Sequence, residues 1–285
     1  MRAPVRTVRV TPWAHVAAAF ALLALVAGCS GGGNTPPPPD ATVVPSEILI
    51  AFDRQGALHL VDPATGVNTL KLATNIDGAN LSVVSAALYV TEAGRIWLGM
   101  GGLSAIPCSG CLLSLDHTTG AATVLSEPDV KGLTSLARSP AGGFIYAASG
   151  KTSELWGINP ADGAPQRIAN FSEGVARGGG MAFDRNGVLY AALDLALYRV
   201  DPSTAVTTRV QQLTYNGFPT PIVDGAVNSL ALLGNTMYGL IFDRQDPLRA
   251  TYLVTIDLAT AAVTHVGPTA SPMEGLAVVP GNLLP

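Results

Sequence analysis

The chain has 285 residues, of which 48% are hydrophobic, 13% charged and 6% aromatic, and it contains 31 Gly and 21 Pro. The apolar content excludes a wholly disordered chain. The charged fraction is about half of the roughly 25% found in average globular domains, which argues against coiled coils and long exposed helices. A formal net charge of −4 gives no support for binding to nucleic acid. The composition favours a Gly- and turn-rich β protein.

The first 29 residues have the pattern of an export signal. Three Arg residues and no acidic residue precede an apolar run at residues 16–27, which is too short for a membrane-spanning helix of about 20 residues. The run ends in Val26-Ala27-Gly28-Cys29, which resembles the lipobox of bacterial lipoproteins, with Val at the first position where Leu is commoner. The resemblance implies that residues 1–28 are removed and that Cys29 carries a lipid such as palmitate. An ordinary signal peptide, or a short anchor with an incidental Cys, is the alternative.

Residues 29–46 are predicted to tether a folded body to the membrane. The segment is rich in Gly, Pro and Ser without hydrophobic periodicity, and in extended form it spans roughly 50 Å at about 3 Å per residue. Removal of residues 1–28 leaves 16 − 3 = 13 basic and 20 acidic side chains. The resemblance to lipoproteins implies anchoring in the bacterial cell envelope. Ser30, in place of the Asp associated with inner-membrane retention, favours the outer membrane.

The remaining residues, 47–285, contain an internal repeat. Five segments alternate apolar and polar residues, reach an acid or an amide, and continue through Thr, Gly or Ala into a second β-prone run. This pattern is typical of a strand, a tight turn and another strand. The acid or amide recurs about every 49 residues, a spacing typical of propeller blades. The five residues are Asp62, Asp116, Asn159, Asp201 and Asp257.

A Tyr marks the second strand of four predicted repeats, each of which has four short strands. The tyrosines follow apolar starts at Leu81, Leu136, Met181 and Leu230 and are Tyr89, Tyr146, Tyr190 and Tyr238. A fifth first strand is predicted at 275–279, and residues 47–52, 58–62 and 67–73 supply the three strands that it lacks. One C-terminal and three N-terminal strands then close a five-bladed β-propeller and pair its strand edges. Six blades are the alternative if residues 92–111 hide further strands.

Two segments resemble known propeller families. Tyr89-Val90-Thr91-Glu92 is close to the motif of the YVTN group, and residues 181–190 resemble a strand pair of NHL propellers. The wider pattern is also similar to SMP-30-like propellers. The resemblance implies the fold and not an activity.

The lengths of the predicted loops indicate which face of the propeller binds a ligand. Connections between second and third strands and between blades emerge on one face, and the variable ones fall there, at 92–111, 170–180, 213–228 and 243–250. The loop 213–228 is the candidate ligand contact, through Tyr215, Phe218 and Asp224. A repeated Phe-Asp-Arg adds polar contacts, although salt-bridged turns explain the same residues. These contacts are Asp53, Arg54, Asp243 and Arg244.

Acidic residues with a nearby Gly recur in the loops that lead into each first strand. If these acidic residues surround the mouth of the central channel of the propeller, their oxygens would offer a site for Ca²⁺ or another divalent cation, as the resemblance to SMP-30-like lactonases implies. Turn chemistry alone explains the same acid–Gly pairs. The five residues are Asp77, Asp129, Glu173, Asp224 and Glu274.

Cys108 and Cys111 form a C-x-x-C in the longest predicted loop. The pattern lacks further metal ligands, a His for haem attachment and a helix for thioredoxin-like chemistry, so in an exported protein we expect a disulfide. The motifs G-x-S-x-G, G-x-x-x-x-G-K-[ST] and H-E-x-x-H are absent from the sequence.

Together the patterns predict a membrane-tethered, non-enzymatic binding module whose partner is an envelope protein, peptide or glycan. The alternative is a metal-dependent enzyme that resembles SMP-30-like lactonases or streptogramin lyase-like propellers and uses the ring of carboxylates.

Overall fold

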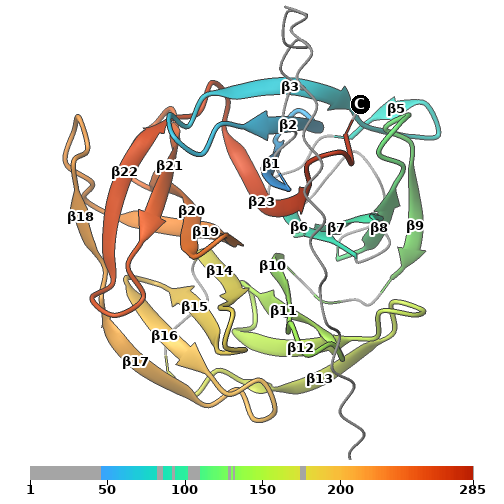
Figure 1. Ribbon diagram of the computed structural model, residues 1–285. Helices are drawn as coiled ribbons and strands as arrows, with labels where there is room; N and C mark the ends of the chain where they lie inside the picture. Colours follow the sequence, from blue (N-terminus) through green and yellow to red (C-terminus); the bar gives the residue numbers. More distant parts are fainter. Residues whose placement is uncertain are drawn as a thin grey trace, which may run out of the picture. The chain divides into compact units, whose positions relative to one another are not determined.

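The computed structural model describes residues 46–81, 86–91, 94–101, 110–127, 130, 132–173 and 178–284. In these residues all regular structure is β strand, and none forms a helix long and apolar enough to cross a membrane. The predicted signal, Cys29 and the predicted tether up to residue 45 lie outside them, as do Cys108 and Asp129. The strands form five blades around one axis, which is the five-bladed propeller expected from the sequence (Figure 1).

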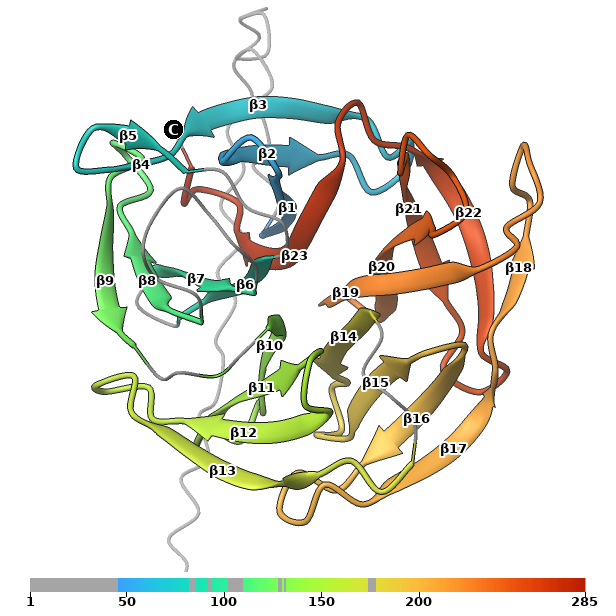
Figure 2. The same cartoon turned by 180° about the vertical axis from the view of Figure 1, so that it is seen from behind.

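Each blade is a sheet whose first strand lies nearest the axis and whose fourth strand lies at the rim (Figures 1 and 2). Blade I consists of β23 (Met273–Pro280), β1 (Glu47–Asp53), β2 (Ala57–Val61) and β3 (Asn68–Ala73). Blade II consists of β6 (Ala86–Val90), β7 (Ile96–Met100), β8 (Leu112–Leu115) and β9 (Ala122–Ser126), and the hairpin β4 (Asn75–Ile76)–β5 (Ala79–Asn80) precedes it.

The other three blades follow in chain order. Blade III consists of β10 (Leu133–Arg138), β11 (Ile145–Ser149), β12 (Glu154–Ile158) and β13 (Pro165–Asn170). Blade IV consists of β14 (Gly178–Phe183), β15 (Leu189–Leu193), β16 (Ala196–Val200) and β17 (Thr207–Gln212). Blade V consists of β19 (Gly225–Leu233), β20 (Thr236–Asp243), β21 (Thr251–Ile256), β22 (Ala262–Pro268) and an additional outer strand, β18 (Thr214–Asn216).

Blade I joins the N-terminal and C-terminal strands. β1 pairs with β23 in antiparallel register, with Leu49 opposite Val278 and Ile50 opposite Ala277. Ile50 packs in a core shared with blade II and Leu49 in a core shared with blade V, and both side chains are fully buried. One C-terminal and three N-terminal strands therefore close the ring with five blades, as predicted.

Blade II departs from the predicted strand order. Tyr89 lies in β6, the first strand, and Trp97 of β7 lies opposite it, in the position that the repeated Tyr holds in blades III to V. The segment 92–111 thus contains a second strand, and the connection between second and third strands is only 101–111. The prediction was wrong here because Ala-Ala-Leu-Tyr-Val is as apolar as a second strand, and the hairpin β4–β5 lengthens the segment before it.

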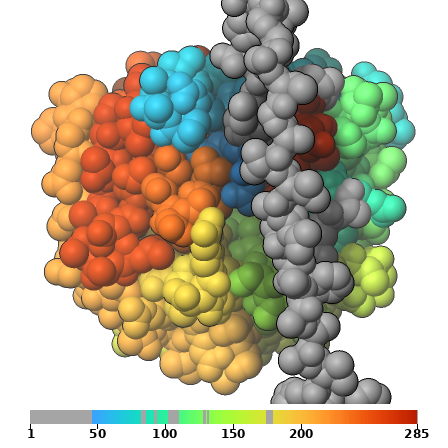
Figure 3. All heavy atoms as spheres, viewed as in Figure 1, coloured from blue at the N-terminus to red at the C-terminus, as the bar shows by residue number. Residues whose placement is uncertain are grey.

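The turn between third and fourth strands repeats in all five blades. Its first residue, Asp or Asn, accepts hydrogen bonds from later backbone N–H groups, as Asp116 does from Thr118 (2.8 Å) and Thr119 (2.9 Å). Blade twist turns the outer strands along the rim (Figure 1), so each fourth strand ends beside the next blade. The space-filling view shows the blades packed side by side (Figure 3).

Neighbouring blades are hydrogen-bonded at the rim, where the connection that leaves one blade meets the third–fourth turn or the fourth strand of the next. These bonds run from Asn75 N–H to Gly120 O (2.9 Å), Ser126 Oγ to Gly163 O (2.9 Å), Ser172 N–H to Ala205 O (3.3 Å), Thr214 N–H to Ala261 O (3.3 Å) and Ala270 N–H to Asn68 Oδ1 (2.6 Å). Each blade therefore helps to hold the blade that follows it.

Candidate functional site

Two faces of the propeller differ in their connections. Second–third connections and the segments that lead into first strands lie together, as the bonds from Arg54 N–H to Pro272 O (3.2 Å) and from Arg244 N–H to Asp224 O (3.0 Å) show. We call this the variable face. The first–second turns lie at the other end of the first strands, on the constant face.

The connection 213–224 of blade V begins as a strand. β18 runs parallel to β22, with Tyr215 opposite Val263, and covers the outer edge of the blade (Figure 2). The predicted loop 213–228 is therefore a loop only at residues 217–224, because β19 begins at Gly225. This short stretch returns from the rim across the variable face.

Tyr215 and Phe218 hold this connection against blade V. Their rings lie 6.2 Å apart at 84°, and Phe218 packs on Tyr252 (5.6 Å) and His265 (5.1 Å) of β21 and β22. Burial raises the pKa of Tyr215 to about 12, and burial lowers the pKa of His265. Both predicted contact residues are only partly exposed, so they position the loop, and direct contact with a ligand stays a prediction.

Asp243 fixes the two connections of blade V to each other. Its carboxylate is buried and accepts hydrogen bonds from the N–H groups of Val223 (2.8 Å), Asp224 (3.2 Å) and Gln245 (2.9 Å). Burial acts to raise the pKa of Asp243, but these donors and the Arg244 guanidinium outweigh it, and the pKa is lowered. The ionised carboxylate thus joins residues 223–224 to the end of β20.

Arg244 links blades IV and V on the same face. Its Nη1 lies 2.7 Å from Asp224 Oδ1 and 3.9 Å from Oδ1 of Asp194, which is in the second–third turn of blade IV. Asp194 has a left-handed backbone (φ 53°) and was not among the predicted site residues. Both predicted residues Asp224 and Arg244 lie on the variable face, and the structure shows that they pair with each other and adds Asp194.

The most exposed large apolar side chains in the described part of the chain lie in the two connections that carry Asp224 and Arg244. Leu248 is 81% exposed and Val223 is 65% exposed. Asp246 shapes the turn that carries Leu248, because its carboxylate accepts the N–H groups of Leu248 (2.9 Å) and Ala250 (3.0 Å). We call residues 217–224 and 244–250 the blade V loop surface. Leu248 was not among the predicted site residues, although an isolated Leu within the polar sequence Asp-Pro-Leu-Arg indicates exposure.

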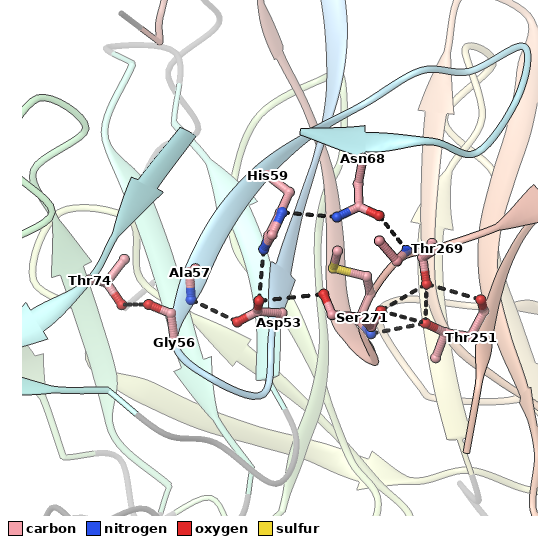
Figure 4. Close-up of polar contacts among 11 residues, drawn as sticks. Asp53, Gly56, Ala57, His59, Asn68, Thr74, Thr251, Thr269 and Ser271 are labelled. Carbon is pink, nitrogen blue, oxygen red and sulfur yellow. Dashed lines mark hydrogen bonds and ion pairs between the residues drawn. The ribbon is translucent and has the colours of Figure 1, made fainter. Parts of the chain in front are cut away.

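Asp53 belongs to a buried network on blade I, 5% exposed, and not to an open polar surface. Its carboxylate accepts Ala57 N–H (2.9 Å) and contacts His59 Nε2 (2.7 Å), and Asn68 Nδ2 lies 2.9 Å from His59 Nδ1 (Figure 4). Ala270 N–H donates to Asn68 Oδ1, so Asn68 Nδ2 must be the donor to His59, and His59 then carries its proton on Nε2. The network joins three N-terminal strands to the segment before β23.

The four predicted carboxylates within the described ranges do not form a metal-binding group with one another. Asp77 is exposed in the β4–β5 hairpin, Glu173 is exposed, and Asp224 pairs with Arg244. Glu274 is buried and pairs with Arg54, and burial raises its pKa against the opposing effect of that Arg. Within the described ranges no three His, Cys, Asp or Glu residues form a group suited to a metal ion.

One buried oxygen beside Glu274 lacks a partner. Asn228 is 7% exposed, and its Nδ2 donates to Met273 O (3.1 Å) and Glu274 Oε2 (3.4 Å), while Oδ1 has no hydrogen-bond partner among the residues described. Glu274 and Asn228 together offer fewer oxygens than the six to eight that Ca²⁺ takes. The five-carboxylate site stays a prediction, since Asp129 lies outside the described residues.

Cys111 is disulfide-bonded and buried. It is the only Cys within the described residues, so its partner lies outside them, and the pairing with Cys108 stays a prediction.

No protein-family model and no curated protein matches the sequence. A chain in the crystal structure of a nidogen–laminin complex is 10% identical, with a TM-score of 0.51 over 81% of this chain and 98% of that chain. A protein assigned as TolB from Agrobacterium tumefaciens is also 10% identical, with a TM-score of 0.51 over 80% of this chain and 83% of that chain. At such low identity the likeness concerns the fold alone.

Proposed function

We propose that the propeller is a binding module of the bacterial envelope and that it binds a protein or peptide through the blade V loop surface. The observation that carries the proposal is the exposure of Leu248 and Val223 in the two connections that the Arg244–Asp224 pair joins. Apolar side chains bordered by charged groups are typical of protein interaction sites. A glycan is the other partner class that the test below distinguishes.

The loop surface is ordered before a partner arrives. Asp243 holds residues 223–224, Asp246 holds the turn of Leu248, and the Arg249 guanidinium lies 5.9 Å above the ring of Phe242. Binding to a rigid surface loses less conformational entropy than binding to a mobile loop. This arrangement supports recognition rather than catalysis.

The predicted lipid on Cys29 and the tether 29–46 belong to the same proposal. They would anchor the module to the outer membrane, as the resemblance to lipoproteins implies. Glu47, the first strand residue after the tether, lies at the opposite end of β1 from Asp53 and the variable face.

The test compares two double variants that each remove exposed apolar side chains. Val223→Ser/Leu248→Ser changes the loop surface, and Val67→Ser/Leu70→Ser is the matched control on blade I, where those side chains are 60% and 59% exposed. After cross-linking in intact cells and recovery of the full chain, we expect the first variant to retain about tenfold less of a protein partner and the control to match wild type. Equal recovery by both variants, or a glycan as the partner, would contradict the proposal.

A metal-dependent hydrolase or lyase is the second candidate, and Asn228 Oδ1, which has no partner among the described residues and lies beside Glu274, favours it. Ca²⁺ that raises the Tm of wild type, but not of Glu274→Gln, would support this candidate. An unchanged Tm in both proteins would count against it.

A further inference from the structure

A cavity of about 180 Å³ lies on the axis of the propeller, between the five first strands. Each first strand contributes three consecutive residues, at 88–90, 136–138, 181–183, 230–232 and 276–278. The first residue of each triplet is apolar, and these five residues form the first layer of the cavity. They are Leu88, Leu136, Met181, Leu230 and Leu276. An engineered cavity of about 150 Å³ lined by apolar side chains admits a molecule the size of benzene, so the volume of the axial cavity is sufficient for a small ligand.

Alanine keeps the middle layer of the cavity open. The middle residue of each triplet is Ala in four blades, namely Ala137, Ala182, Ala231 and Ala277, and each of them retains 5–7% exposure. The large aromatic side chain at this level is on the second strand, where Tyr146, Tyr190 and Tyr238 lie opposite three of these alanines. Since Ala has no atoms beyond Cβ, space remains on the axis side.

Blade II and blade III supply the polar groups of the cavity. Tyr89 replaces the Ala of the other blades, and Arg138 Nη1 donates to the Tyr89 hydroxyl at 3.4 Å. The cavity shares the lining residues Arg138, Phe183 and Leu232 with a pocket of about 260 Å³ on the constant face. The cavity thus has apolar layers, a hydrogen-bonding end and a surface pocket beside that end.

We infer that the axial cavity binds a small amphiphile, with an apolar body against the Leu and Ala layers and one hydrogen-bonding head group at Tyr89 and Arg138. Apolar walls with a few convergent polar groups are the common composition of small-molecule sites. The site is separate from the blade V loop surface, because none of its lining residues belongs to segments 217–224 and 244–250. The inference therefore does not depend on the proposed protein partner.

The test uses 1-hexanol as the probe, on the chain without residues 1–28. Ala182→Leu fills the middle layer, and Ala141→Leu, on an exposed first–second turn of the constant face, is the matched control. We expect hexanol to raise the Tm of wild type and of the control in a saturable manner, with at least tenfold weaker binding to Ala182→Leu. If Ala182→Leu does not fold, Ala231→Val replaces it as the filled variant.

A spectroscopic signal locates the probe independently. The rings of Tyr89 and Trp97 lie 6.3 Å apart at 74°, so a head group at Tyr89 should change the emission of Trp97, measured in a Trp156→Phe background. Saturable binding with this change supports the inference. The absence of saturable binding, or equal affinity in the filled and control variants, would overturn it.

Discussion

Gly120 occupies the last position of the third–fourth turn of blade II, with φ of 74°. A Cβ atom there would overlap the carbonyl oxygen of Ala73, because the end of β3 lies against the turn. Blades IV and V place Ala205 and Ala261 at the same position with φ of 59° and 56°, so the backbone tolerates a side chain at a cost of about 1 kcal/mol. Contact with the neighbouring blade, more than the backbone angle, therefore requires glycine in blade II.

We predict that Gly120→Ala lowers the free energy of unfolding by about 2–4 kcal/mol, because steric overlap adds to the cost of the left-handed backbone. Gly143→Ala is the matched control, since Gly143 has φ of 90° but, its chain neighbours aside, no atom within 4 Å of the place that a Cβ would take. It should lose only about 1 kcal/mol. Denaturant unfolding measures both, and equal losses would contradict the explanation.

Four of the five third–fourth turns contain an Asp whose carboxylate accepts hydrogen bonds within the turn. The pKa values of Asp62, Asp116, Asp201 and Asp257 are lowered, because turn N–H and hydroxyl groups donate to the charged form; for Asp116 the N–H of Thr119 is the largest cause. Blade III builds the same turn without a charge, since Asn159 Oδ1 accepts Ala161 N–H at 3.0 Å. The charge is therefore dispensable for turn geometry but makes four turns sensitive to acid.

The sign of this sensitivity follows from the lowered pKa values. A carboxylate whose pKa is lower in the folded state contributes stability above the unfolded pKa of about 4, and that stability is lost as the pH falls below it. Differential scanning calorimetry between about pH 5 and pH 3 should therefore show a smaller fall in Tm when the four turn Asp residues are replaced by Asn. The control Asp77→Asn, at an exposed hairpin, should follow wild type. A quadruple variant that declines as steeply as wild type would contradict this account.

β18 shows how a connection can become part of a blade. Three residues pair with β22, and Phe218 then packs on Tyr252 and His265, so the strand covers an edge that would otherwise be open. The same contacts place residues 217–224 on the variable face. A deletion of residues 214–222 would therefore uncover β22 as well as remove a loop, which is why point substitutions test the binding surface more cleanly.

At the scale of the whole molecule, stability depends on joining the two ends of the propeller. Met273, Leu276 and Val279 of β23 are buried, and β23 is the first strand of a blade whose other strands come from the N-terminal end. Without β23, β1 would expose an unpaired edge, and the apolar faces of blades II and V would lose their contacts with it. Closure and folding of the ring are therefore coupled.

We predict that a chain ending at Pro272 shows no cooperative thermal transition and that a peptide of residues 273–285, added in trans, restores one. A chain ending at Leu284 retains β23 together with Leu283 and Leu284, which pack against the core of blades I and II, and should melt close to wild type. Circular dichroism follows the transitions. A chain ending at Pro272 that melts at the wild-type temperature without the peptide would contradict coupled closure.

The fold was accessible from the sequence because its signals are local and repeated. Asp or Asn at the third–fourth turn recurs in every blade, and the average spacing between these residues indicated the five blades. Tyr89 was assigned to the wrong strand because a five-residue apolar run does not distinguish a first strand from a second. For the site, Asp243 and Arg244 lie at the end of a second strand as expected, but Asp194, the third member of that charge cluster, comes from another blade.

The sequence by itself determined the repeat and the way in which the ring closes, since these follow from patterns within one repeat and from the strands at the two ends. The choice of five blades over six needed the structure, in which the strand within 92–111 is the second strand of blade II. Only the tertiary structure decided which side chains are exposed. Tyr215 and Phe218 are partly buried because β18 packs on β22, whereas Leu248 and Val223 project from turns that two carboxylates hold in place. Exposure depends on contacts between segments that are distant in the chain, and no local pattern records those contacts.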